Sequence, residues 1–237
     1  MTTSGCLLYD VRMPRRGKFI TFEGLDGCGK STQVEKLASV LRMQGHSVVV
    51  TREPGGTATG EKIRNVLLDS STVGLSPFAE LALMFASRAQ HIKEIIQPSL
   101  ASGQIVLCDR FTDSTEAYQG GGRKLGMKPV LDLHRILCGD LQPELTILMD
   151  SDVNASVERA RRRNMHKVAD RSGETDENRF EQESQKFFER VQEAYLRIAA
   201  REPQRIAVVN ARGPAAETHK NIVEIVRSKL RLETKSA

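Results

Sequence analysis

An eight-residue segment near the amino end constrains the fold more than any other feature of this chain. It runs from Gly24 to Ser31, reads GLDGCGKS, and matches the pattern GxxxxGK[ST] at every fixed position. A short strand pattern, Phe19 to Glu23, precedes it, and a helical pattern follows it directly. In that context, glycine-rich backbone N–H groups converge on phosphate oxygens at the positive end of the helix dipole. The segment therefore predicts a phosphate-binding loop in an α/β domain.

The rest of the chain alternates short apolar strands with helical patterns, the order that produces a parallel sheet with crossover helices. The expected strands are Phe19–Glu23, Ser47–Thr51, Ile105–Cys108, Leu145–Met149 and Ile206–Val209. Helical spacing predicts two buried faces, formed by Val34, Leu37, Ala38 and Leu41 and by Phe187, Val191, Ala194 and Ile198. We predict an α/β protein of the P-loop NTPase class, with a five-stranded parallel sheet flanked by helices and a mobile lid.

A length of 237 residues favours a single domain. Residues 1–16 show no period and are predicted to be a disordered extension, with residues 17–237 forming the domain. Met13 is a plausible alternative start, and we expect removal of residues 1–12 to leave activity intact. The lid is predicted at 159–179, because this stretch is rich in charge and poor in apolar anchors.

A net charge of +5 is compatible with a nucleic-acid partner, but no reader module is recognisable. Two basic clusters, Arg12–Lys18 and Arg159–Lys167, supply much of the excess charge, and a small anionic substrate would favour them equally. We therefore expect no nucleic-acid partner. The chain could alternatively be a nucleotide-binding regulatory module or a nucleic-acid-associated module. Oligonucleotide binding that depends steeply on salt, together with no turnover of monophosphates, would favour this alternative.

Four scattered cysteines form no metal-binding spacing and are typical of reduced thiols in a cytosolic protein. His134 and Cys138 share a helical face, and we expect them to pack in the core rather than bind a metal. No apolar run approaches the ~20 residues that a membrane span needs, and no secretory segment is evident. The sequence thus predicts a cytoplasmic protein with no membrane partner.

The motif assigns chemistry to two of its side chains. Lys30 places a charge at the β- and γ-phosphates of a nucleoside triphosphate, and the Ser31 hydroxyl can bind Mg²⁺. Further polar clusters follow predicted strands, namely TREPGG from Thr51 and DRF from Asp109. Because the carboxyl ends of parallel strands share one edge of a sheet, we expect these clusters to face the loop.

Together these motifs closely resemble the thymidylate kinase family. FEGLDGCGKST, TREPGG, DRF with STEAYQGGGR, and RFEQES with FFERV and AYL occur in the family's order and span about residues 18–200. The combination is far more specific than the phosphate-binding loop alone. The resemblance implies transfer of the γ-phosphoryl group of ATP to thymidine monophosphate (dTMP) in dTTP biosynthesis, with Mg²⁺, in a homodimer.

The resemblance also implies roles for individual residues. Arg110 is expected to hold the acceptor phosphate, Asp26 to accept the 3′-hydroxyl, and Tyr118 to crowd the 2′ position. The ATP site is expected to comprise Gly24, Leu25, Asp26, Gly27, Cys28, Gly29, Lys30, Ser31, Thr32 and Arg159. The dTMP site is expected to comprise Asp26, Arg52, Glu53, Pro54, Met84, Phe85, Arg88, Arg110, Thr115, Tyr118 and Gln119. The expected catalytic residues are Lys30, Arg110, Arg161 and Arg163, and the expected metal-binding residues are Ser31 and Asp109.

The chain departs from the family pattern at the base-stacking position. The family's Phe aligns with Met84, and Phe85 follows one residue later, so either Phe85 reaches the base or Met84 packs against it; we favour Phe85. Gly27 replaces the P-loop arginine of some members, which resembles the bacterial type with lid arginines. A solvated helix face is the alternative interpretation of that basic run, and Asn178 stands where the family has Asp.

Two other enzyme classes remain to be distinguished. Another nucleoside monophosphate kinase, acting on uridylate or deoxyuridylate, would share the fold, and a panel of monophosphates would separate it. A GTPase switch would carry an NKxD motif, which this sequence lacks.

Overall fold

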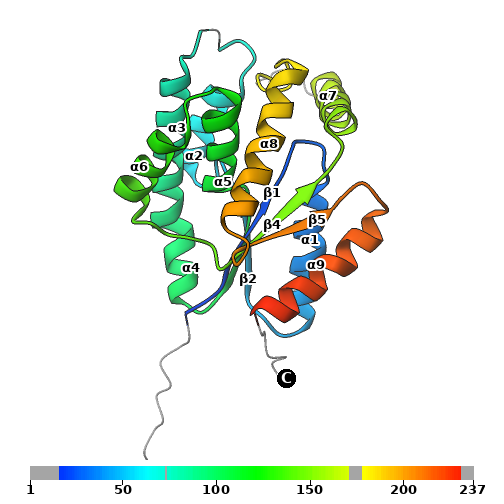
Figure 1. Ribbon diagram of the computed structural model, residues 1–237. Helices are drawn as coiled ribbons and strands as arrows, with labels where there is room; N and C mark the ends of the chain where they lie inside the picture. Colours follow the sequence, from blue (N-terminus) through cyan, green and yellow to red (C-terminus); the bar gives the residue numbers. More distant parts are fainter. Residues whose placement is uncertain (1–15, 73, 171–177, 231–237) are drawn as a thin grey trace, which may run out of the picture.

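Five parallel strands form one sheet in the order β2-β3-β1-β4-β5 (Figure 1). The computed structural model of the protein describes residues 16–72, 74–170 and 178–230. Residues 1–15 of the predicted extension and 171–177 of the predicted lid lie outside them. The strands are β1 (Phe19–Glu23), β2 (Val48–Arg52), β3 (Ile105–Asp109), β4 (Leu145–Asp150) and β5 (Ile206–Asn210). The predicted fold class and its five strands are confirmed, within one residue at each strand end.

Helices cover both faces of the sheet, with α1 and α9 on one side and α3, α4, α6 and α8 on the other (Figure 1). The helices are α1 (Lys30–Met43), α2 (Ala58–Leu68), α3 (Pro77–His91), α4 (Gln97–Ala101), α5 (Thr112–Thr115), α6 (Met127–Cys138), α7 (Val153–Asp170), α8 (Gln185–Arg201) and α9 (Ala215–Leu230). Two π-helical segments join them, η1 (Ile92–Ile96) and η2 (Glu116–Gly122). Thr57, Ser76 and Ser184 cap α2, α3 and α8 by accepting backbone N–H groups of their first turns.

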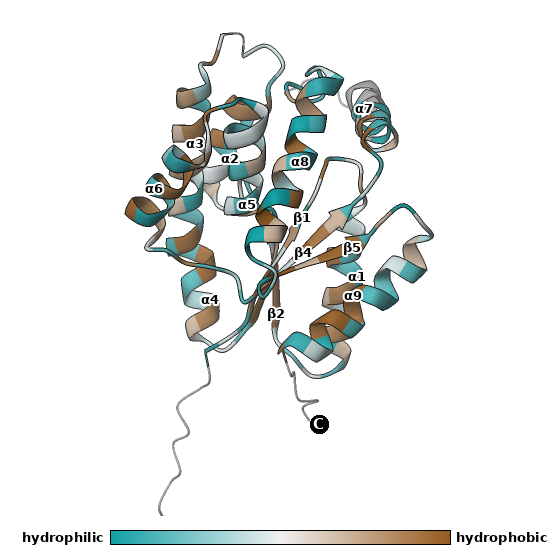
Figure 2. Cartoon of the chain, viewed as in Figure 1, coloured by the Kyte–Doolittle hydropathy of each residue, from teal (hydrophilic) through white to brown (hydrophobic). Residues whose placement is uncertain are grey.

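Successive side chains along each strand point to opposite faces of the sheet, which divides the core between the two faces. Ile105 and Leu107 of β3 pack with α1 and α9, whereas Val106 and Cys108 pack with α3, η1 and α4. Figure 2 shows apolar residues along the strands and on the helix surfaces that face them. Parallel strands buried on both faces read as continuous apolar runs, which is why the strands were recognisable in the sequence.

The predicted helical stripes are buried as expected. Val34, Leu37, Ala38 and Leu41 of α1 are at most 2% exposed, and the four apolar positions of α8 are buried against Tyr118 and its neighbours. His134 and Cys138 are also buried, and His134 Nδ1 lies 3.0 Å from Thr112 Oγ1. The expectation that this pair belongs to the core is confirmed.

The strand order places three polar strand ends at one edge of the sheet. β1 lies at the centre, and its Phe22 pairs with Asp109 of β3 on one side and with Ile147 of β4 on the other. The strands β2 and β3 lie on one side of β1, and β4 and β5 lie on the other side, so the topological switch point of the sheet lies where β1 ends.

Among the described residues, no helix combines the length and apolarity needed to span a bilayer.

Candidate active site

The loop between β1 and α1 is shaped by glycines that no other residue could replace without strain. Gly24, Gly27 and Gly29 all have positive φ values, 132°, 78° and 97°. A Cβ on Gly27 would lie 2.1 Å from the carbonyl oxygen of Ser156 in α7. The loop therefore curls tightly against α7, and its backbone conformation is available only to glycine.

The side chain of Lys30 folds back into this loop. Its Nζ donates hydrogen bonds to the carbonyl oxygens of Gly24 and Leu25 at 3.1 and 2.8 Å, and it lies 3.9 Å from Asp26 Oδ1. The loop thus holds a buried ammonium group at the N-terminus of α1, where the helix dipole also favours anions. This is the arrangement that a polyphosphate needs.

The end of β3 supplies a carboxylate to the same loop. The Ser31 hydroxyl donates a hydrogen bond to Asp109 Oδ2 at 2.9 Å. Asp109 Oδ1 is buried and makes no hydrogen bond within the described part of the chain. A hydroxyl and a carboxylate oxygen are hard oxygen ligands, so the pair suits a small divalent cation.

Arg110 follows in a left-handed backbone conformation, φ 76°, which turns its side chain into the crevice. Its Nη2 lies 2.8 Å from Asp26 Oδ1, and its guanidinium stacks 5.0 Å from the Tyr118 ring centroid. Nη1 donates to the hydroxyls of Ser114 and Tyr195 at 2.9 and 3.1 Å. Arg110 is therefore a positive group fixed on three sides at the mouth of the phosphate loop.

Asp26 is ionised in this setting. Although desolvation opposes ionisation, the charges of Arg110 and Lys30 hold the pKa of Asp26 below its usual range. Tyr118 also donates a hydrogen bond to Asp26 Oδ2 at 3.5 Å. An ionised carboxylate only accepts hydrogen bonds, so Asp26 can receive a ligand hydroxyl but cannot donate to one.

A second arginine is buried deeper in the crevice. Arg88 Nε donates to Glu53 Oε2 at 2.7 Å, and Nη2 donates to Thr115 Oγ1 at 2.9 Å. Phe85 and Phe111 flank its guanidinium at 4.9 and 5.1 Å. Although burial opposes ionisation, the contacts with Arg88 and His91 keep the pKa of Glu53 below its ordinary value, so Glu53 stays ionised.

Two buried polar atoms near Arg88 make no hydrogen bond within the described residues. One is Arg88 Nη1, a donor, and the other is Gln119 Oε1, an acceptor. Gln119 Nε2 donates to Glu80 Oε1 at 2.8 Å, which orients the amide and leaves its oxygen free. Because unpaired buried polar groups are costly, a free donor and a free acceptor on the wall of one cavity indicate a ligand edge of matching pattern.

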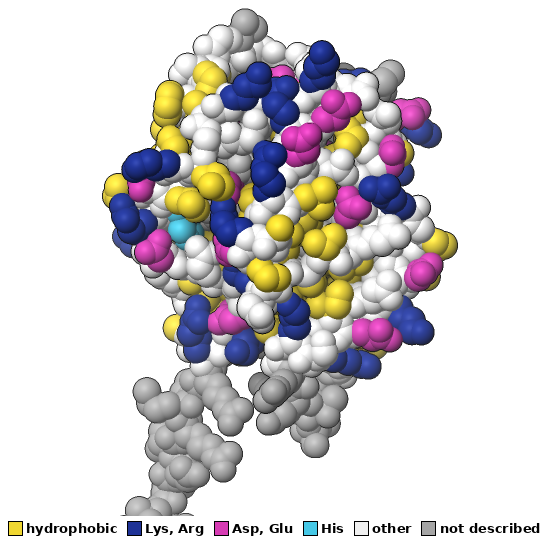
Figure 3. All heavy atoms as spheres, in the orientation of Figure 1, with side chains coloured by type: hydrophobic (Ala, Val, Ile, Leu, Met, Phe, Trp, Pro, Cys, Tyr) yellow, Lys and Arg dark blue, Asp and Glu magenta, His cyan; other side chains and the backbone are white. Residues whose placement is uncertain are grey.

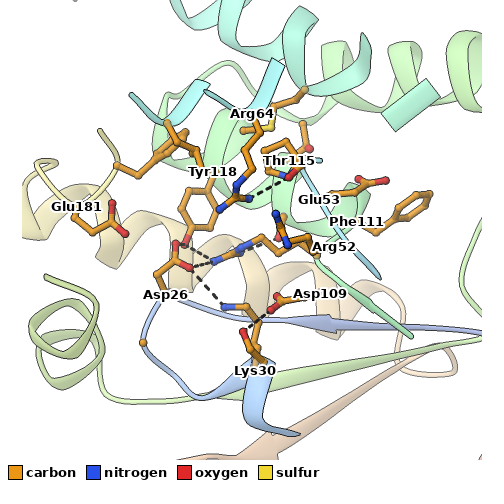
Figure 4. Close-up of a pocket in the computed structure, with 18 of the residues that line it drawn as sticks. Asp26, Lys30, Arg52, Glu53, Arg64, Asp109, Phe111, Thr115, Tyr118 and Glu181 are labelled. Carbon is orange, nitrogen blue, oxygen red and sulfur yellow. Dashed lines mark hydrogen bonds and ion pairs between the residues drawn. The ribbon is translucent and has the colours of Figure 1, made fainter. Parts of the chain in front are cut away.

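One cavity of about 900 Å³ joins these groups, and Figure 4 shows Asp26, Lys30, Tyr118 and Thr115 around it. It is lined by the following predicted residues: Asp26, Gly27, Gly29, Lys30, Ser31, Thr32, Arg52, Glu53, Pro54, Met84, Arg88, Asp109, Arg110, Thr115, Tyr118, Gln119 and Arg163. The structure thus brings together residues from the phosphate loop, the ends of β2 and β3, and the helical elements α3, α5, η2 and α7. Such a volume accommodates a drug-sized ligand.

Comparison with known proteins agrees with this geometry. The family model described as thymidylate kinase matches residues 22–222. The chain belongs to the thymidylate kinase family. It is 47% identical over 215 residues to the thymidylate kinase of Pelobacter propionicus, covering 90% of this chain and 96% of that relative. It is 48% identical over 199 residues to that of Desulfosudis oleivorans, covering 84% and 91%. The crystal structure of thymidylate kinase from Ehrlichia chaffeensis superimposes with a TM-score of 0.70 at 32% identity, covering 90% of this chain and 99% of that one.

The structure places the two candidate base-stacking residues in different surroundings. Phe85 is completely buried in the apolar cluster between α3 and the sheet, and it does not line the cavity. Met84, one position earlier, does line it. Adjacent helical residues point about 100° apart, so only one of the two can face a ligand, and α3 turns Met84 toward it.

The lid arginines that the family suggests point in three directions. Arg163 lines the cavity from α7. Arg159 Nε donates to the carbonyl oxygen of Gly27 at 2.8 Å, and Arg161 donates to the carbonyl oxygens of Glu181 and Glu183 at 2.9 and 3.2 Å. Neither Arg159 nor Arg161 lines the cavity, and both contact backbone carbonyl oxygens instead.

Three residues of the phosphate loop also lie outside the cavity wall, namely Gly24, Leu25 and Cys28.

Several wall residues were absent from the sequence-based assignment. They are Arg64, Asn65, Leu68, Phe111, Ser114, Asn164, Phe180 and Glu181. Phe180 and Glu181 belong to the RFEQES motif, whose presence could have indicated them. Desolvation, with the negative charge of Asp26, raises the pKa of Glu181 to about 7. Arg64 donates to the carbonyl oxygen of Pro54 at 3.0 Å and had no local signal.

Proposed function

We infer that the protein transfers the γ-phosphoryl group of ATP to the phosphate of dTMP, forming dTDP and ADP in dTTP biosynthesis. The observation that carries this inference is a single cavity with two different ends. One end is the phosphate-binding loop with Lys30, and the other holds the unpaired donor of Arg88 and the unpaired acceptor of Gln119. A triphosphate donor and a base-bearing acceptor can therefore meet in one cavity.

The unpaired atoms match the edge of a thymine base. Thymine offers a carbonyl oxygen, O4, beside an N–H group, N3, which complement Arg88 Nη1 and Gln119 Oε1 respectively. Cytosine presents the reverse pattern at the same positions, which would leave both protein groups unpaired. Sites built to form such hydrogen bonds reject mismatched ligands strongly, so we expect little turnover of cytidylates.

Arg110 is placed to receive the acceptor phosphate. Its planar guanidinium matches a phosphate monoester, and its neighbours fix its direction. The acceptor phosphate is already largely dianionic at neutral pH, with a second pKa of about 6, so no general base is needed. The protein instead brings two anions together and stabilises charge on the transferring group.

Lys30 and Arg163 supply positive charge on the donor side. Lys30 lies at the loop, and Arg163 reaches the cavity from α7, which makes Arg163 the lid arginine that we propose for catalysis. Fixed charges of this kind are most effective in a closed site that excludes water.

Ser31 and Asp109 would hold the Mg²⁺ that kinases of this type use with ATP. The buried, unpaired Oδ1 of Asp109 and the Ser31 hydroxyl fit this ion, because Mg²⁺ prefers hard oxygen ligands. When bound, the ion would neutralise charge on the polyphosphate.

An ADP-release assay with a panel of monophosphates tests the proposed function. We expect turnover with dTMP that greatly exceeds turnover with dCMP, dAMP and UMP, and that disappears on EDTA treatment or in Lys30→Ala. Equal or greater turnover of dUMP or UMP would instead identify another monophosphate kinase. Absence of ADP formation with every monophosphate would overturn the proposal.

We also propose a cytoplasmic homodimer without a nucleic-acid partner. Figure 3 shows Lys and Arg side chains interspersed with Asp and Glu on the visible face, unlike a basic stripe for a phosphate backbone. Exposed apolar side chains on α3 and α6, including Phe78 and Ile136 at 62% and 70% exposure, support a partner subunit. Sedimentation equilibrium would detect the dimer, and a monomer at micromolar concentration would contradict it.

A further inference from the structure

A buried carboxylate lies beneath the active site and does not line its cavity. Glu23 is the last residue of β1 and is completely buried. Burying a carboxylate is costly unless hydrogen bonds compensate for the loss of water. The chemistry proposed above gives Glu23 no part, so its retention at the end of the central strand needs another explanation.

Within the described part of the chain, every hydrogen bond of the Glu23 side chain leads to the surroundings of Arg110. Oε1 accepts the backbone N–H of Phe111 at 2.7 Å, and Oε2 accepts the hydroxyl of Tyr195 at 3.1 Å. Ser114 also donates its hydroxyl hydrogen to Oε2. These two hydroxyls are the same groups that accept from Arg110 Nη1.

The direction of these hydrogen bonds explains how Glu23 acts on Arg110. A hydroxyl has one hydrogen to donate and lone pairs to accept. When the hydroxyls of Ser114 and Tyr195 donate to Glu23, their lone pairs are left facing the guanidinium of Arg110. Because Oε2 of Glu23 is the acceptor that both hydroxyls share, it fixes them in the orientation that Arg110 requires.

The same carboxylate supports the backbone on which Arg110 sits. Arg110 has φ 76°, a conformation that is unfavourable for a non-glycine residue and persists only when neighbours enforce it. The turn is held on one side by Arg110 N–H donating to the Phe22 carbonyl at 2.9 Å. On the other side, Phe111 N–H donates to Glu23.

We propose that Glu23 is a positioning residue that holds Arg110 in the acceptor site, acting through Ser114, Tyr195 and the Phe111 amide. The inference rests on the proposed function, since it takes Arg110 as the group that binds the dTMP phosphate. Glu23 touches neither nucleotide; it organises the arginine that does. Loss of Glu23 therefore weakens use of dTMP and leaves the interaction with ATP nearly unchanged.

A double-mutant cycle between Glu23→Gln and Arg110→Ala tests this coupling. In the wild-type background, we expect Glu23→Gln to lower kcat/KM for dTMP by about tenfold or more, while KM for ATP changes less than about twofold, because residues in one network are coupled. In the Arg110→Ala background, the same change should have almost no further effect. Additive losses, or equal damage to the ATP and dTMP parameters, would overturn the proposal.

Two further variants keep the test decisive. Tyr195→Phe retains the ring and removes one relay hydroxyl, so it should reproduce part of the dTMP-selective loss even if Glu23→Gln folds poorly. An unchanged kcat/KM for dTMP in Tyr195→Phe would contradict the relay. Glu35→Gln, an exposed glutamate on α1, serves as the matched control and should behave as wild type. A wild-type protein without dTMP kinase activity would refute the proposed function itself, whereas an active enzyme with an additive cycle refutes only this inference.

Discussion

Replacing Glu23 by Gln should change how the stability of the fold depends on pH. Burial, together with the negative charge of Asp113, raises the pKa of Glu23 from its ordinary value of 4.5 to about 7, although Ser114, Arg110 and the Phe111 N–H oppose the rise. Tyr195 and Cys108 are the other ionisable neighbours, and burial raises the pKa of both, so they stay neutral. Between the two pKa values, folded Glu23 retains a proton that the unfolded chain has released.

The sign and size of the effect follow from linkage. Because the folded state binds the extra proton, this group's stabilisation is complete below pH 4.5 and is lost as pH rises through 7. The full difference is on the order of 3 kcal/mol, and most of it falls between pH 5 and pH 8. Glutamine has nearly the same shape and does not titrate, so the variant lacks this contribution.

Urea unfolding monitored by far-UV circular dichroism at several pH values measures the contribution. We expect the unfolding free energy of the wild type, minus that of Glu23→Gln, to fall by about 2–3 kcal/mol from pH 5 to pH 8. The same difference for Glu35→Gln, the exposed control, should stay flat. A Glu23 difference that is constant within about 0.5 kcal/mol, or that rises with pH, would refute the reasoning.

Three other substitutions test separate parts of the site. Arg163→Ala should lower kcat by about 10³ with little change in Tm, whereas Arg161→Ala should lower Tm because two contacts with backbone carbonyls are lost. Steady-state kinetics and calorimetry distinguish the two variants. A normal kcat in Arg163→Ala would contradict the catalytic role. Gly27→Ala should destabilise the fold by about 1–3 kcal/mol, because the new Cβ would lie 2.1 Å from the Ser156 carbonyl oxygen and φ of residue 27 is positive. An unchanged denaturation midpoint would show that α7 can move away from the loop without a loss of stability. Arg88→Lys should raise KM for dTMP by about tenfold or more, because an ammonium group cannot reproduce the two hydrogen bonds that the guanidinium donates to Glu53 and Thr115. The KM for ATP serves as the internal control and should stay unchanged.

The fold and the donor half of the site could be predicted because their signals are local. The phosphate loop is a contiguous motif, and strands buried on both faces appear as short apolar runs such as Ile105–Cys108. Family resemblance placed Arg110, Tyr118 and Gln119 correctly on the cavity wall. Their individual roles in binding and catalysis stay predictions until tested.

The sequence-based assignment and the cavity wall differ mainly where the rotation of a helix decides, which local sequence does not fix. Met84 and Phe85 are both apolar, and only the packing of α3 against the sheet decides which is buried. Arg161 and Arg163 are likewise two residues apart on α7, so they point to different sides of it. Arg64 reaches the cavity because α2 folds over the Glu53–Pro54 segment, a contact between elements that no motif records.

Helix α7 contacts two separate segments of the cavity wall through arginines two positions apart. Arg159 binds the Gly27 carbonyl of the donor loop, and Arg161 binds the carbonyl of Glu181, which lines the cavity from the segment before α8. A displacement of this one helix alters both regions together, and we expect the two nucleotides to influence each other's affinity. Thermodynamic reciprocity then requires ATP to change the dissociation constant of dTMP by the same factor as dTMP changes that of ATP.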